Sequence, residues 1–209
     1  MKTNKAKKMK ILVADLEGVF VPEIWVNVAR KTKIKELAQT TRDVNDYDKL
    51  MTKRLSILKE NNLKIKDIKD VIVSLKPLKN AFKTLRWIRK HSQIIILSDT
   101  FEEFAIPLMA QLDFPTLLCH SLNIDEQGNI IGYNLRIREQ KLQTVIALQK
   151  MNYHVIAFGD SYNDIKMLNQ ADQAFLFKPP VSIAKEFSNF KVAKDFKELK
   201  IIISKLLDL

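Results

Sequence analysis

Residues 10–18 read KILVADLEG, an apolar run that stops at the first of two carboxylates, Asp15 and Glu17. A short apolar run that ends near a glycine is typical of a buried strand. Similar apolar runs lie at 93–97, 154–158 and 174–177. Because amphipathic stretches of helical spacing separate these runs, we predict an α/β fold with a parallel sheet between two layers of helices.

The segment between the first two predicted strands has a helical pattern. From Pro22 onward its apolar residues recur with helical spacing, and no strand pattern interrupts them before Pro77 ends the region. Pro22 can open a helix, because the N–H that proline lacks would have no partner there. We therefore predict a small helical cap at 22–75, inserted into a core made of 1–21 and 76–209. We expect this cap to pack over the end of the first strand and to close over a crevice there.

In the rest of the chain, strand patterns and helix patterns continue to alternate. An alternating stretch around Gln127-Gly128-Asn129 predicts a β-hairpin. Helical spacing predicts further helices at 78–89, around 104–112, at 140–151, from 164 onward and up to about 207.

The net charge of +11 and the pI near 9.6 raise the question of nucleic-acid binding. The lysines are scattered along the chain and alternate with acidic residues, and no cluster of arginine and aromatic residues stands out. This pattern is typical of solvated faces, and it favours an enzyme with an anionic substrate over a nucleic-acid-binding protein.

Cys119 is the one cysteine, which excludes an internal disulfide and a cysteine-based zinc site and indicates a reducing compartment. No apolar run reaches the roughly 20 residues that a bilayer span needs, and the basic start lacks the long apolar stretch of a secretory signal. We therefore predict a cytoplasmic protein. The three histidines, His91, His120 and His154, lack metal-ligand spacing, so we assign them structural or surface roles.

Polar clusters follow three of the apolar runs: Asp15-Leu16-Glu17, Ser98-Asp99-Thr100 and the stretch 160–164, DSYND. Any one of them alone would be an ordinary turn. In an open parallel sheet the carboxyl ends of the strands meet at one crevice, so three clusters would bring several carboxylates together. Mg²⁺ binds hard oxygen ligands and would offset their repulsion. If the first strand stays extended, Asp15 and Glu17 share a face, where one could act as nucleophile and the other could transfer protons.

Four motifs occur in order: DLEGV at 15–19, LSDT at 97–100, Lys141, and GDSYND at 159–164. Together they resemble the motifs of the haloacid dehalogenase superfamily of phosphatases. Stretches outside these motifs, 74–78 and 114–120 among them, resemble more narrowly the family of bifunctional phosphoserine phosphatases and homoserine phosphotransferases. The resemblance covers nearly the whole chain from about Lys10. It implies a three-layer, Rossmann-like core and a Mg²⁺-dependent phosphoryl transfer.

The resemblance also implies roles for the acidic residues. Asp15 would be the nucleophile that forms an aspartyl-phosphate, and Glu17 would protonate the leaving group and then deprotonate the acceptor. Asp15, the Glu17 main-chain carbonyl and Asp160 would hold Mg²⁺, with Asp164 behind them. Most members of the superfamily carry aspartate where this chain has Glu17, whereas the narrower family carries glutamate, and the extra methylene moves the acid–base group by about one bond length.

Around the phosphate, the resemblance implies that Ser98 and the Asp99 N–H bind phosphate oxygens and that Lys141 offsets negative charge. Without the motif order, Lys141 would read as a surface lysine.

Three further positions match residues that contact the substrate. Glu23 and Arg54, in the cap, would bind the ammonium and carboxylate of an amino-acid substrate, and Asn163 would contact it as well. Taken alone, Arg54 would be a solvated helix residue and Glu23 a favourable acid in a first helical turn. A carboxylate ligand suits Arg54 because a guanidinium can form paired hydrogen bonds with it.

Phosphoserine is the donor that this reasoning favours. Another small phosphomonoester with the same mechanism is the first alternative, and a basic nucleic-acid-binding protein on a phosphatase-like scaffold is the second. Whether water or homoserine accepts the phosphoryl group, and whether the chain forms oligomers, stays open.

Overall fold

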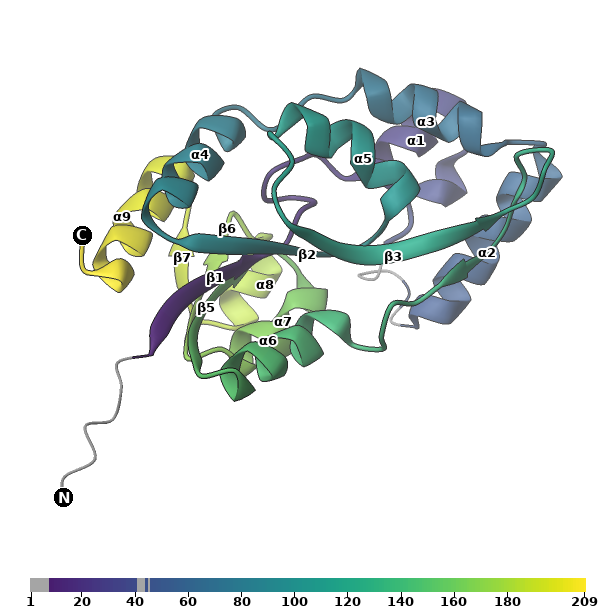
Figure 1. Ribbon diagram of the computed structural model, residues 1–209. Coiled ribbons are helices and arrows are strands. Elements are labelled where there is room, and N and C mark those ends of the chain that lie inside the picture. Colours follow the sequence, from purple (N-terminus) through teal and green to yellow (C-terminus); the bar gives the residue numbers. More distant parts are fainter. Residues whose placement is uncertain (1–7, 41–43, 45) are drawn as a thin grey trace.

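The structure is a computed structural model that describes residues 8–40, 44 and 46–209, so most of the lysine-rich start lies outside it. Within these residues a seven-stranded sheet has the order β4-β3-β2-β1-β5-β6-β7 (Figure 1). All neighbouring strands are parallel except the pair β3 and β4, which is antiparallel. The strands are β1 Met9–Ala14, β2 Gln93–Phe101, β3 Leu117–Ile124, β4 Ile130–Asn134, β5 Tyr153–Gly159, β6 Gln173–Phe177 and β7 Lys191–Ala193.

Both faces of the sheet are covered, which confirms the predicted α/β class. Alternate residues of β1 point to opposite sides, so Leu12 and Ala14 lie in one buried cluster and Ile11 and Val13 in another. The first cluster includes residues of α4, α5 and α9, and the second includes residues of α6, α7 and α8. These helices are α4 Ala81–His91, α5 Glu102–Gln111, α6 Gln140–Lys150, α7 Ile165–Gln170, α8 Val181–Glu186 and α9 Phe196–Leu207.

The segment predicted to be helical contains α1 Ile24–Thr32, the 3₁₀-helix Lys35–Ala38, α2 Tyr47–Glu60 and α3 Ile65–Ser74, and its described residues form no strand of the sheet. The first helix begins two residues later than Pro22, because Glu23 occupies its N-cap position. Buried residues of these helices, such as Val28 and Ile68, belong to the same cluster as Leu12 of the central strand.

The β-hairpin is where the sequence predicts it, with Gly128 at a positive φ of 81° in the turn between β3 and β4. However, β3 begins already at Leu117 and pairs with β2 in parallel, so the hairpin extends the main sheet. Strand β7 and helix α8 were not predicted, since segments of three and six residues carry too little periodicity.

Strands β2, β1 and β5 are neighbours and run in the same direction, so their carboxyl ends lie at one edge of the sheet. The predicted polar clusters lie at this edge. Strand β2 continues through Ser98 and Asp99 to Phe101, whereas the sequence predicts its end before Ser98. Among the described residues, no helix is both long enough and apolar enough to span a membrane.

Candidate active site

The turn after β1 brings two carboxylates to the edge of the sheet. The strand ends at Ala14, so the condition under which strand alternation would put Asp15 and Glu17 on one face is not met. Instead the chain turns at Gly18, whose φ is 76° and where a Cβ would collide with the carboxylate of Asp160. Glu17 Oε2 then accepts a hydrogen bond of 2.7 Å from the N–H of Ile24, at the first turn of α1. A helix N-terminus and not strand alternation therefore holds Glu17.

Three buried carboxylates lie close together, and one lysine contacts two of them. Oxygens of Asp15, Asp160 and Asp164 lie within 4.8 Å of one another. The Lys141 Nζ lies 2.9 Å from Asp15 Oδ1 and 2.8 Å from Asp164 Oδ1. The predicted convergence of the motifs on one crevice is therefore what the structure contains.

The charged groups in this cluster shift one another's pKa values. Burial, followed by the charge of Asp164, raises the pKa of Asp15 well above its usual value, although Lys141 opposes the shift. Burial alone would lower the pKa of Lys141, but the carboxylates of Asp15 and Asp164 raise it well above its usual value. Lys141 is therefore an ammonium at neutral pH, and further positive charge is needed for Asp15 to ionise readily.

The donor set fits Mg²⁺, because the clustered ligands are hard carboxylate oxygens. Asp164 is already engaged: Oδ1 accepts from Lys141, and Oδ2 accepts from the N–H groups of Asp160 and Ser161 at 2.9 and 3.0 Å. This leaves Asp15 and Asp160 as the carboxylates suited to direct metal binding, with Asp164 behind them.

A cavity of about 80 Å³ opens beside Asp15. Residues near the carboxyl ends of the strands and residues of the helical segment line it, among them seven residues to which the sequence analysis assigned a role. Its lining residues are Asp15, Glu17, Glu23, Trp25, Thr40, Tyr47, Leu50, Arg54, Ser98, Asp99, Thr100, Ser161 and Asn163.

Arg54 supplies a buried cation to this cavity. Its guanidinium lies 4.5 Å from the centre of the Trp25 ring, and Nη2 donates to the carbonyl of Gln39 at 2.7 Å. Arg54 Nε is buried and has no hydrogen-bond partner among the residues that the structure describes. Burial lowers the pKa of Arg54 to about 10, so it stays charged at neutral pH.

Glu17 titrates near neutrality. Burial, followed by the charge of Glu23, raises the pKa of Glu17 to about 7, and the hydrogen bond from Ile24 only partly opposes this. A carboxyl group with this pKa can both release and accept a proton at neutral pH, as general acid–base catalysis requires.

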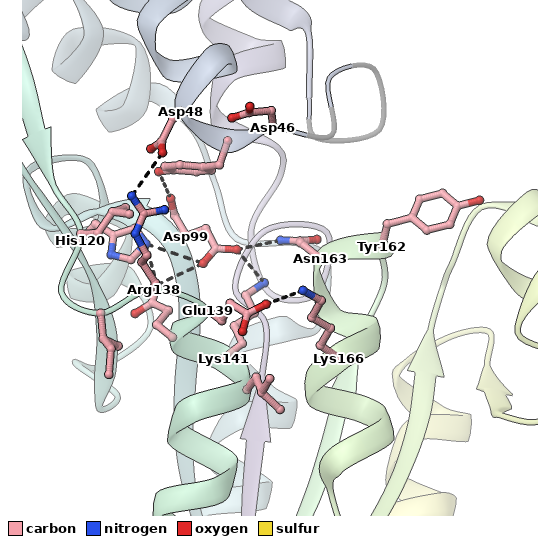
Figure 2. Close-up of a pocket in the computed structure, with 15 residues that line it drawn as sticks. Asp46, Asp48, Asp99, His120, Arg138, Glu139, Lys141, Tyr162, Asn163 and Lys166 are labelled. Atoms are coloured by element: carbon pink, nitrogen blue, oxygen red, sulfur yellow. Dashed lines mark hydrogen bonds and ion pairs between the residues drawn. The ribbon is translucent and has the colours of Figure 1, made fainter.

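A second, larger hollow of about 670 Å³ adjoins the cavity (Figure 2). Tyr47, Asp99 and Asn163 line both spaces, and the hydroxyl of Tyr47 donates to the Asp99 carbonyl at 2.9 Å. Sequence reasoning missed Tyr47 and Gln140, and it gave the buried His120 no place near the site. Only the position of Gln140 directly before Lys141 could have drawn attention to it.

Comparison with known proteins agrees with this architecture. The model of the haloacid dehalogenase-like hydrolase family matches residues 4–172. The chain belongs to this family. The family resemblance inferred from the motifs is therefore confirmed.

Two curated hydrolases of the family are similar over nearly the whole chain. The phosphoserine phosphatase ThrH of Pseudomonas aeruginosa is 51% identical over 92% of this chain and 94% of its own. A phosphoserine phosphatase of Pseudomonas syringae pv. tomato is 50% identical over 92% of this chain and 81% of its own. A solved structure described as a phospho-aspartyl intermediate analogue of phosphoserine phosphatase has a TM-score of 0.77 at 20% identity, over 94% of this chain and 99% of that chain, which shows the shared fold.

Proposed function

We propose that this hydrolase is a Mg²⁺-dependent phosphoserine phosphatase that carries the phosphoryl group on Asp15. The observation that carries the proposal is the position of Asp15: it lies beside Lys141 and lines the same cavity as Glu17, Glu23 and Arg54. Phosphate chemistry and amino-acid recognition would then occur in one cavity. The names of the two similar relatives support the same substrate.

In the first step, Asp15 attacks phosphorus. Its Oδ1 accepts hydrogen bonds from the Leu16 N–H at 2.8 Å and is paired with Lys141, so Oδ2 is the atom suited to attack. The new Oδ2–P bond forms as the bond from phosphorus to the serine oxygen breaks. Glu17 gives its proton to that leaving oxygen, a transfer that its pKa of about 7 favours.

In the second step, Glu17 takes a proton from the acceptor hydroxyl as the acceptor oxygen bonds to phosphorus. The Oδ2–P bond then breaks, and Asp15 leaves as a carboxylate. Mg²⁺, when held by Asp15, Asp160 and the Glu17 carbonyl, would supply the positive charge that lets a carboxylate approach a phosphate group. Ser98, the Asp99 N–H and Lys141 would bind and orient the phosphate oxygens.

The amino-acid part of the substrate lies toward the helical segment in this proposal. Arg54 would pair with the carboxylate and Glu23 with the ammonium, and Asn163, which lines the same cavity, would contact the substrate as well. The division into a cap at 22–75 and a core at 1–21 and 76–209 belongs to the same proposal. The cap carries Glu23 and Arg54, and it would close over the bound substrate and exclude bulk water. We place the enzyme in the cytoplasm.

Homoserine is a candidate acceptor beside water, because the motifs and the stretches outside them resemble the bifunctional phosphoserine phosphatases and homoserine phosphotransferases. A direct test is product analysis with phosphoserine, Mg²⁺ and homoserine in one reaction. Free phosphate alone would identify a phosphatase, and phosphohomoserine beside it would identify a phosphotransferase. Turnover of other small phosphomonoesters but not of phosphoserine would contradict the proposed donor.

A further inference from the structure

The mechanism above gives no role to the carboxylate of Asp99, which lies at the centre of a polar network (Figure 2). Asp99 Oδ2 accepts a hydrogen bond of 3.1 Å from Asn163 Nδ2 and lies 3.8 Å from Lys141 Nζ. Burial alone would raise the pKa of Asp99, but Lys141 and the hydrogen bonds from Asn163 and Gln140 hold this pKa below its usual value. A charged Asp99 can therefore orient both Asn163 and Lys141.

Gln140 holds the other side of this carboxylate. Its side chain is 1% exposed, and its Nε2 donates to the Ser98 carbonyl at 2.5 Å and to Asp99 Oδ1 at 3.2 Å. Gln140 and Lys141 are the first two residues of α6; Gln140 contacts Ser98, within β2, and Lys141 contacts Asp15, directly after β1. The start of α6 thus contacts both Ser98, a proposed phosphate-binding residue, and Asp15, the proposed nucleophile.

His120, from β3, lies behind Gln140. The Arg136 N–H donates to His120 Nδ1 at 3.1 Å, so the neutral ring carries its proton on Nε2. That Nε2 lies 3.3 Å from Gln140 Nε2 and 3.8 Å from Asp99 Oδ1. Gln140 thus donates to the oxygen of Asp99 that faces away from Asn163, and the His120 ring packs beside both Gln140 and this oxygen.

We propose that Gln140 and His120 are positioning residues that act through Asp99. They hold its carboxylate where it orients Asn163 and Lys141 toward the bound phosphomonoester. Both line the larger hollow and neither lines the cavity beside Asp15, and Asp99 is the cavity residue that lies near both of them. This inference rests on the proposed phosphatase function.

The test is a pair of double-mutant cycles, Gln140→Leu with Asp99→Asn and His120→Asn with Asp99→Asn. Each assay uses Mg²⁺ with phosphoserine and, separately, with a generic aryl phosphate. We expect each single variant to lower kcat by about tenfold on both substrates while KM changes by less than about twofold. In the Asp99→Asn background, the second substitution should change kcat by less than about twofold.

A similar group of a glutamine, a histidine and an aspartate, whose glutamine is Gln149 of the same helix, supplies matched control variants. Gln149 Nε2 donates to the Gln170 carbonyl at 3.0 Å and to Asp172 Oδ2 at 3.1 Å, and His154 Nδ1 lies 3.9 Å from Asp172 Oδ1. None of these residues lines the cavity or the adjoining hollow. Gln149→Leu and His154→Asn should therefore leave kcat within about twofold of wild type.

A second measurement does not depend on turnover. The NMR signal of the Asn163 side-chain amide, assigned with Asn163→Asp, should shift in the Gln140→Leu and His120→Asn variants as it does in Asp99→Asn, and should stay in place in the two controls. An unmoved signal, wild-type kcat in either site variant, or losses that multiply in the Asp99→Asn background would overturn the inference. If the protein turns over the aryl phosphate but not phosphoserine, the proposed donor is wrong. The double-mutant cycles with the aryl phosphate then still test the positioning role of Gln140 and His120.

Discussion

At the scale of single residues, Glu17 combines a functional pKa with a cost in stability. Its pKa rises from 4.5 to about 7 on folding, so the folded state binds its proton more tightly than the unfolded chain does. Below pH 4.5 Glu17 is protonated in both the folded and the unfolded state, and its favourable contribution to the free energy of unfolding is complete. This contribution is lost as the pH rises toward 7. Above that pH, a buried charge destabilises the fold.

We therefore predict that Glu17→Gln abolishes turnover but raises the free energy of unfolding at pH 8 by about 2 kcal/mol more than at pH 5. Urea unfolding without Mg²⁺ measures this difference. Glu36→Gln is the control, because Glu36 lies on the surface, and it should shift stability equally at both pH values. If the two substitutions had equal effects on the pH dependence of stability, the Glu17 charge would not destabilise the folded state as proposed.

Arg54 gives a prediction about specificity. Arg54→Ala should lower kcat/KM for phosphoserine at least about tenfold more than for a generic aryl phosphate, because a carboxylate partner is lost only with the first substrate. Steady-state kinetics with both substrates measures the ratio. Lys53→Ala, at an exposed neighbouring position on α2, should leave the ratio unchanged. Losses of equal size on both substrates would remove Arg54 from the proposed recognition role.

The site residues that follow the apolar runs could be predicted from the sequence, whereas the residues that hydrogen-bond to them from distant elements could not. Asp15, Ser98 and Asp160 stand directly beside apolar runs, and parallel strands bring such ends together. Gln140 reaches Ser98 across 42 positions, and Tyr47 reaches Asp99 across 52. Neither contact produces a recognisable pattern in the nearby sequence, because each depends on how distant elements pack against one another.

At the scale of elements, α2 is tied to the sheet by neighbouring residues at its start. The Tyr47 hydroxyl donates to the Asp99 carbonyl at 2.9 Å, and Asp48 Oδ1 accepts from the Tyr133 hydroxyl at 2.6 Å. The helix that carries Arg54 is thus connected to β2 and to the hairpin strand β4. The sequence predicts the helix and the hairpin but not the contact between them. It also misses the parallel pairing of β3 with β2, because the residues from Leu117 onward do not alternate between apolar and polar.

We predict that Tyr47→Phe loosens α2 without unfolding the protein. One hydrogen bond is lost, worth about 1 kcal/mol, while the ring keeps its packing. Amide hydrogen exchange should become faster in Tyr47–Glu60, by up to about fivefold, and stay unchanged in α9. Unchanged exchange in α2 would show that this bond does not hold the helix.

At the scale of the whole molecule, charge balance links metal binding to stability. Asp15, Asp160 and Asp164 are buried together, and Lys141 alone cannot neutralise three carboxylates. Bound Mg²⁺ should therefore stabilise the folded state by mass action. We predict that saturating Mg²⁺ raises Tm by several degrees, a few kcal/mol in free energy, and that Asp160→Asn removes this increase.

Thermal unfolding with and without Mg²⁺ measures this prediction. Asp172→Asn is the matched control, because Asp172 accepts hydrogen bonds on the same sheet away from the cavity and should keep the Mg²⁺-dependent increase. An increase that persists in Asp160→Asn would place the metal elsewhere.

The covalent role of Asp15 is the claim on which the proposed function depends most. Rapid mixing of the protein with phosphoserine and Mg²⁺, acid quenching and mass spectrometry of the peptides measures it directly. We predict that the added mass of one phosphoryl group lies on Asp15 during turnover and that Asp15→Asn neither carries it nor turns over substrate. Phosphoryl label on another residue, or wild-type turnover by Asp15→Asn, would contradict the account.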